Sequence, residues 1–128
     1  MKLLHIEDLL KRSASKIDKI FTETVVDEKD KADKVRATVM IVPPKAPRMK
    51  LHYHTHREGW ILVLSGQGKE VVGEKEYPIK ANDLLFIPAK ERHRIENTGN
   101  DELKVLEMYS LPHDFIIVEK RSKDDFVF

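Results

Sequence analysis

Three histidines in two short segments most constrain what this chain can fold into. His52 and His54 stand two residues apart in the segment HYHTHRE at 52–58, and His93 follows in the segment PAKERHRIEN at 88–97. In an extended strand alternate side chains point to one face, so His52 and His54 project together. With the Glu58 carboxylate, and with His93 on a strand that can pair beside the first, they make a ligand set suited to a divalent transition metal. The sequence therefore predicts a metal site built on β-strands.

Short apolar segments between turn residues indicate an all-β fold. Residues 35–41 alternate, with Val35 and its alternate neighbours on one face and Arg36, Thr38 and Met40 on the other. A short helix is predicted at 6–12, and further strands at 17–26, 51–55, 60–64, 84–87 and 103–109. Strands of this length and spacing are typical of an antiparallel sandwich or barrel, and 128 residues suit one domain.

The first histidine segment resembles the first sequence motif of the cupin family. That motif reads Gly, five residues, His-x-His, three or four residues, Glu, six residues, Gly. Here Ala46 stands at the first glycine, Glu58 follows His54 after three residues, and Gly66 follows Glu58 after seven residues rather than six. One extra residue would turn a strand inside out, so we predict a β-bulge at Gly59 that lets Glu58 reach the metal.

The second segment resembles the second cupin motif, with both of that motif's glycines replaced. Asn82 stands at the first glycine and tolerates positive φ, whereas Lys90 at the second is expected to be strained or differently folded. Pro88, His93 and Asn97 stand at the matching spacings. The resemblance covers about residues 35–112 and implies a double-stranded β-helix, or jelly-roll barrel, in a single cupin domain over 1–128. A short N-terminal helix and a C-terminal extension flank that barrel.

The resemblance implies one divalent metal, iron, manganese, zinc or nickel, held by His52, His54, Glu58 and His93. His56 shares the strand parity of His52 and His54, so it is either the substitute for Glu58 or a residue at the pocket mouth. Arg36, on the mixed face of its strand, is a candidate to grip a substrate carboxylate or phosphate. His56 and Trp60 are the other candidate substrate-binding residues, and no catalytic residue is assigned.

Composition narrows the functional classes. Lys and Arg number 23 and Asp and Glu 22, with the two signs interspersed, which argues against a nucleic-acid or membrane partner. The chain has no cysteine, so a metal must be held by nitrogen and oxygen. The N-terminal residues lack a signal-peptide pattern, and a cytoplasmic location is expected.

Three functions fit these features. The leading one is a metal-dependent enzyme, of dioxygenase type, that binds an oxygen-rich small molecule at open metal positions. The second is a sugar-phosphate isomerase, because residues 60–66 and 93–99 look like stretches of the cupin part of mannose-6-phosphate isomerases. The third is a non-catalytic metal-binding or sugar-binding module. A homodimer is expected, because the apolar runs at 115–118 and 126–128 lie beyond the barrel motifs.

Overall fold

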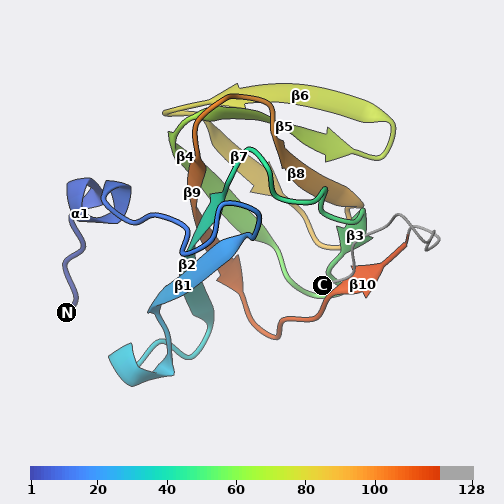
Figure 1. The fold of residues 1–128 in the computed structure, drawn as a ribbon. Helices are drawn as coiled ribbons and strands as arrows, with labels where there is room; N and C mark the ends of the chain where they lie inside the picture. Colours follow the sequence, from blue (N-terminus) through green and yellow to red (C-terminus); the bar gives the residue numbers. More distant parts are fainter. Residues whose placement is uncertain (119–128) are drawn as a thin grey trace.

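The computed structural model of the chain describes residues 1–118 and consists of two five-stranded antiparallel sheets that face each other (Figure 1). One sheet has the strand order β1-β2-β9-β4-β7, and the other has the order β10-β3-β8-β5-β6. This is the predicted jelly-roll barrel with a short N-terminal helix. The elements are α1 (Ile6–Leu10), β1 (Phe21–Val26), the 3-10 helix η1 (Glu28–Asp30), β2 (Val35–Val42), β3 (His52–Tyr53), β4 (Gly59–Ser65), β5 (Gln67–Val72), β6 (Lys75–Lys80), β7 (Leu84–Ile87), β8 (His93–Asn97), β9 (Leu103–Ser110) and β10 (Ile116–Ile117).

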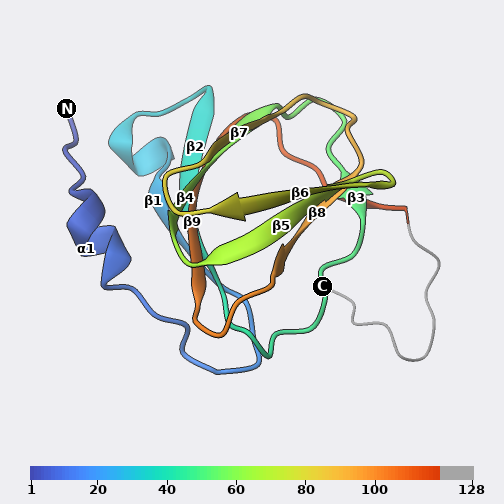
Figure 2. The ribbon, with the colours of Figure 1, turned by 90° about the horizontal axis from the view of Figure 1, so that it is seen from above.

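The alternation predicted for residues 35–41 separates two hydrophobic clusters on the two faces of β2. Val39 and Ile41 belong to a cluster on the outer face, where Leu9 of α1 packs, so the helix covers the outside of the sheet rather than a barrel end (Figure 2). Met40 and Val42 belong to the cluster between the two sheets. Ile17 lies before β1 and is 72% exposed, so the predicted strand at 17–26 begins four residues too early.

The prediction of a bulge at Gly59 is wrong. Gly59 pairs regularly with Ile87 on β7 and with Tyr109 on β9, and the irregularity in β4 comes later, between Val63 and Ser65. A Cβ at Gly59 would lie 2.9 Å from the Met108 carbonyl oxygen, so glycine here permits the close approach of β9. A substitution at Gly59 would disturb the pairing of β4 with β9.

Both replaced glycines of the second motif keep a glycine-like backbone. Asn82 has φ of 77° in the turn before β7, and Lys90 has φ of 68° before β8. The expected strain at Lys90 is therefore present, because a side chain with a Cβ is unfavourable in the left-handed region. The Lys90 amide donates to the His54 carbonyl oxygen over 2.8 Å, which ties this turn to the first histidine segment.

The run at 115–118 pairs within its own chain. Ile116 and Ile117 of β10 lie opposite Tyr53 and His52 of β3, so β10 covers the edge that β3 would otherwise leave open. The homodimer stays a prediction, and residues 126–128 lie outside the described residues. No helix in residues 1–118 is long and apolar enough to cross a membrane.

Candidate metal centre

Three histidine side chains converge between the two sheets. His52 on β3 is paired directly opposite His93 on β8, and His54 follows β3 with the same strand parity. One ligand nitrogen from each ring lies within 4.8 Å of the other two, and all three residues are buried. The His52 and His93 ring centroids are 4.5 Å apart.

Each of these rings is oriented by an acceptor at Nδ1. His52 Nδ1 donates to the Lys50 carbonyl oxygen over 2.7 Å, His54 Nδ1 donates to the Asp114 carbonyl oxygen, and His93 Nδ1 donates to the Glu70 carboxylate over 2.7 Å. A donor at Nδ1 leaves the Nε2 lone pair free, which is the tautomer that a metal requires. His93 Nε2 is buried and has no hydrogen-bond partner among residues 1–118. The donor set and this orphaned nitrogen fit a divalent metal.

Glu70 is the carboxylate behind His93. It lies on β5, where it faces Ile95 of β8, and its side chain is 1% exposed. Its Oε1 accepts from His93, while its Oε2 has no partner in the described part of the chain. Burial raises the pKa of Glu70 well above its usual value, and the charge of Glu107 adds to this. A carboxylate in this position orients the imidazole and makes its Nε2 a stronger ligand.

Burial keeps the three imidazoles neutral. It lowers the pKa of His52 to about 4, with a further contribution from His93, and it lowers the pKa of His54 to about 3. The pKa of His93 falls to about 4 for the same reason. Neutral imidazole is the ligating form, so the cluster is ready to accept a metal at neutral pH.

A cavity of about 260 Å³ opens beside the histidines, and Arg57 lies on its wall. The Arg57 guanidinium stacks over the Tyr109 ring at 3.7 Å, and its Nη2 donates to Glu107 Oε2 over 2.9 Å. Only 13% of the Arg57 side chain is exposed. The wall therefore holds a guanidinium, paired with Glu107, next to the histidine cluster.

The loop before β10 contributes two aromatic rings to the wall of this cavity. Phe115 stacks on His52 with ring centroids 4.1 Å apart, and the His113 ring lies 5.3 Å from that of His54. Arg57 Nη1 donates to His113 Nδ1 over 3.0 Å. The His113 and Phe115 rings therefore lie next to the histidine cluster.

The structure does not bring Glu58 to the histidines. Within residues 1–118 the cluster contains histidines alone, and Glu58 is exposed beside Val35 and Trp60. The reason is the register of β4, in which Gly59 and Ile61 face inward and the residues between and before them face outward. With six residues between it and Gly66, the motif's carboxylate position falls on Gly59, which has no side chain.

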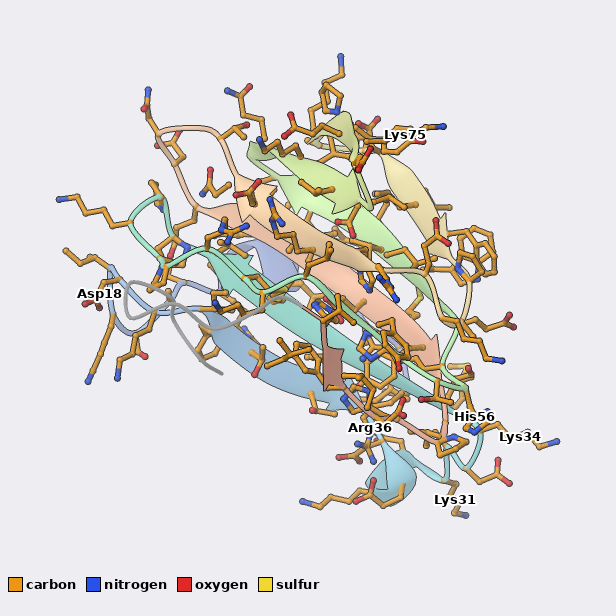
Figure 3. All side chains as sticks on the ribbon, turned by 90° about the vertical axis from the view of Figure 1, so that its right-hand side faces the viewer. Asp18, Lys31, Lys34, Arg36, His56 and Lys75 are labelled. Carbon is orange, nitrogen blue, oxygen red and sulfur yellow. The ribbon has the colours of Figure 1, made fainter. Side chains whose placement is uncertain are left out.

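The three candidate substrate residues lie away from the cavity. His56 is exposed, and Figure 3 shows it with Arg36 at the end of the molecule that bears Lys31 and Lys34. Arg36 is on the inner face of β2 but pairs with Glu28 at 3.4 Å. Trp60 is 46% exposed on the outside of β4 and packs on Phe86. None of the three lines this cavity, but Trp60 lines a smaller cavity of about 20 Å³ together with His54 and His93.

Sequence reasoning missed Arg57, Glu70, Glu107 and Phe115. Arg57 and Phe115 lie on loops, where strand parity gives no direction. Glu107 shares strand parity with Val105 and Tyr109, which was a usable signal, because buried Val105 marks the inner face of β9.

The Cupin domain family model matches residues 38–109 of this chain. This chain is a cupin. The matched range runs from β2 to β9 and includes the three histidines, Glu70 and Arg57. The jelly-roll topology of the structure agrees with this membership.

This cupin is similar to proteins of different kinds. An uncharacterized protein of Methanocaldococcus jannaschii is 32% identical over 107 residues, which cover 83% of this chain and 85% of that protein. A mannose-1-phosphate guanylyltransferase of Klebsiella pneumoniae is 35% identical over 91 residues, which cover 69% of this chain but only 18% of the enzyme. The crystal structure of a predicted oxalate decarboxylase from Thermotoga maritima superposes with a TM-score of 0.63 and 29% identity, covering 77% of this chain and 81% of that one.

Proposed function

We propose that this cupin binds one divalent transition metal through His52, His54 and His93 and captures a small, oxygen-rich anion beside it. The observation that carries the proposal is the orientation of the three rings, each held at Nδ1 by its own acceptor. Ligand positions that these rings do not use would be open to substrate oxygens, where the metal supplies Lewis-acid polarisation. Iron, manganese, zinc and nickel all accept nitrogen donors of this kind.

The ligand class follows from the charge of the cavity wall. Arg57 has five N–H donors, and its bonds to Glu107 and His113 leave others for a bound carboxylate. Its stacking on Tyr109 holds the guanidinium in place. We therefore propose a small carboxylate, such as oxalate, that Arg57 would hold beside the metal. The likeness to a predicted oxalate decarboxylase supports this choice.

The proposal is tested by oxalate binding to the full chain, measured by calorimetry with and without Mn²⁺. Binding is expected to require the metal and to weaken by about tenfold or more in Arg57→Gln, because a charge-assisted contact is lost. Arg36→Gln is the matched control and should leave oxalate binding unchanged. Equal binding by the metal-free chain, or by Arg57→Gln, would overturn the proposal.

Turnover is tested by assays that are separate from the binding measurement. Oxygen uptake with a carboxylate substrate would support dioxygenase chemistry, and release of carbon dioxide without oxygen uptake would support decarboxylation. Binding without turnover would favour a non-catalytic module. Glu107 lies on the cavity wall and is the carboxylate placed to exchange a proton with a bound substrate.

A sugar phosphate is the second candidate ligand. It is favoured by the 35% identity to a mannose-1-phosphate guanylyltransferase over 69% of this chain. In that case Arg57 would hold the phosphate and the metal would hold a sugar hydroxyl. Competition between mannose 6-phosphate and oxalate for the Mn²⁺-loaded chain would show whether both use this cavity.

A further inference from the structure

A second groove lies between two strands that do not pair with each other. β7 is the last strand of one sheet and β6 is the last strand of the other, and a cavity of about 440 Å³ opens between them. Ligand-binding pockets are typically about 300 to 1,000 Å³, so the groove is large enough for a small molecule. Val72, Ile79, Leu85 and Ile87 line it, and Tyr77, Leu84 and Phe86 are exposed along its rim.

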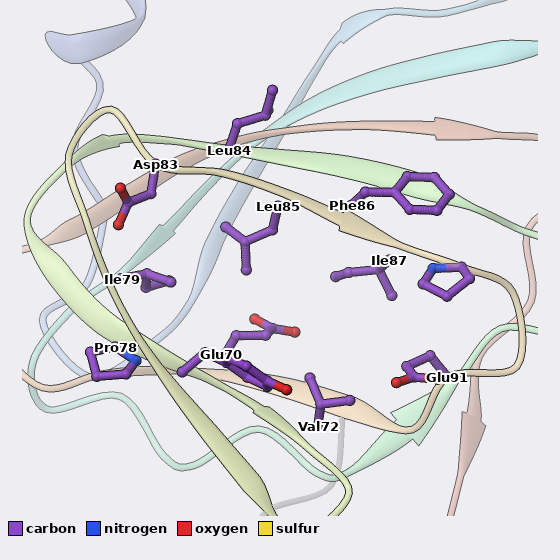
Figure 4. A pocket seen from close by; sticks show the side chains of 12 residues that line it. Glu70, Val72, Pro78, Ile79, Asp83, Leu84, Leu85, Phe86, Ile87 and Glu91 are labelled. Atoms are coloured by element: carbon purple, nitrogen blue, oxygen red, sulfur yellow. The ribbon is translucent and has the colours of Figure 1, made fainter.

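The floor of this groove is the Glu70 carboxylate. Figure 4 shows it between Leu85, Ile87 and Val72, with Asp83 and Glu91 further out. Glu70 Oε1 accepts from His93, but its Oε2 lacks a donor within the described residues although the side chain is 1% exposed. A buried carboxylate oxygen without a donor is costly, so this position calls for a hydrogen-bond donor from outside the protein.

The charges of the groove determine which donor fits. Its lining includes three carboxylates, Glu70, Asp83 and Glu91, and includes no lysine, arginine or histidine. The metal cavity on the other side of Glu70 differs, because its wall holds the Arg57 guanidinium and four histidines besides Glu70 and Glu107. An anion is therefore repelled from the groove, and a cation is attracted to it.

We propose that the groove between β6 and β7 is a second ligand site, which takes an amine with an apolar body. The ammonium group donates to Glu70 Oε2, and the apolar body lies against Leu85 and Ile87. Tyr77 and Phe86 at the rim add aromatic faces, which attract cations. Because Glu70 also holds His93, a ligand here contacts the carboxylate that orients a metal ligand, without entering the metal cavity.

The test uses three probes of one shape and different charge, namely 2-phenylethylamine, 2-phenylethanol and 3-phenylpropionate. Each is titrated into the full chain by calorimetry, once without metal and once with Zn²⁺, and the bound position is mapped by amide NMR shifts. We expect the amine to bind about tenfold more tightly than the alcohol, because its hydrogen bond is charge-assisted. We expect no binding of the carboxylate in the groove, and we expect the amine to bind both with and without Zn²⁺.

Two variants and a control locate the site. Glu70→Gln should lower the amine affinity to that of the alcohol, and Leu85→Trp should fill the groove and abolish binding of both. Ile17→Trp adds the same indole at an exposed position far from the groove and should change nothing. Binding that survives Leu85→Trp, that requires Zn²⁺, or that is equal for amine and alcohol would overturn the proposal. Since the amine test works on metal-free protein, its failure is distinct from a failure of metal and oxalate binding.

Discussion

The two ends of the barrel interior are built from the same strands but have opposite character. On β9, Leu103 and Val105 are fully buried in the apolar cluster, whereas Glu107 and Tyr109 further along the same inner face line the metal cavity. On β8 the polar residue, His93, comes first along the chain, and the apolar residue, Ile95, follows it. The barrel thus separates a dry end, which supplies stability, from a polar end, which supplies binding.

The polar end is stabilised by specific partners rather than by apolar packing. The histidines there depend on single acceptors, such as Glu70 for His93. Removing an acceptor should alter metal binding, while removing a methyl group at the dry end should alter stability. The effect on metal binding and the effect on stability should therefore be separable.

The largest expected effect is of pH on the metal-free chain, and it acts at the polar end. In the unfolded chain the three histidines bind protons below about pH 6.5, but in the folded chain their pKa values are about 4 for His52 and His93 and about 3 for His54. The unfolded state therefore binds more protons, and the free energy of unfolding falls as pH is lowered from about 6.5 toward 4, by about 1.4 kcal/mol per pH unit per histidine at most. Urea unfolding at pH 7 and pH 5 measures this. His54→Gln should flatten the dependence, and an equal slope in that variant would contradict the assignment.

At the dry end, Leu103→Ala should lower the free energy of unfolding by about 2 to 5 kcal/mol, because it leaves a cavity at a side chain with no exposed surface. Chemical denaturation measures the loss. Metal affinity per folded chain should stay the same, because Leu103 belongs to the apolar cluster between the sheets and not to the histidine cluster. A parallel loss of metal affinity would show that the two ends are not independent.

At the polar end, Glu70→Gln should lower metal affinity about 10-fold to 100-fold, as is typical when the group behind a metal-bound histidine is changed. Competition with a chelator of known affinity measures the change. Glu96→Gln is the matched control, because Glu96 lies on β8 but pairs with Lys69 at 3.4 Å. An equal loss of metal affinity in both variants would show that Glu70 does not support metal binding through His93.

The smallest expected effect is at the turn that leads into β8. Lys90→Gly should raise the free energy of unfolding by about 1 kcal/mol, since glycine adopts φ of 68° without a Cβ clash. Thermal and urea unfolding measure it. A decrease in stability would mean that the lysine side chain contributes more than its backbone conformation costs.

The barrel and the pairing of the two histidine segments were predictable from sequence, because strand parity fixes which side chains share a face. His52 and His54 converge with His93 for that reason. Glu58 was not predictable in the same way, because its direction depends on where β4 begins, and a shift of one residue reverses the face. Glycine at 59 was interpreted as a bulge, whereas it permits close contact with β9.

The contacts that support the histidine cluster could not be predicted from local sequence patterns. The Asp114 carbonyl oxygen and the Phe115 ring come to His54 and His52 from a loop some sixty residues away in the chain. Glu70 sits in the short, polar segment QGKEVV, where a glutamate is normally a surface residue. Such positions become visible only when the pairing of β5 with β8 is known.

The central claim, a metal held by three histidines without Glu58, is tested most directly by metal content and affinity in three proteins. These are the unaltered chain, His52→Ala combined with His93→Ala, and Glu58→Gln, each measured by elemental analysis after dialysis against one divalent metal. The account predicts about one metal per chain for the unaltered protein and for Glu58→Gln, and none for the double variant. Full metal content in the double variant, or its loss in Glu58→Gln, would contradict the account.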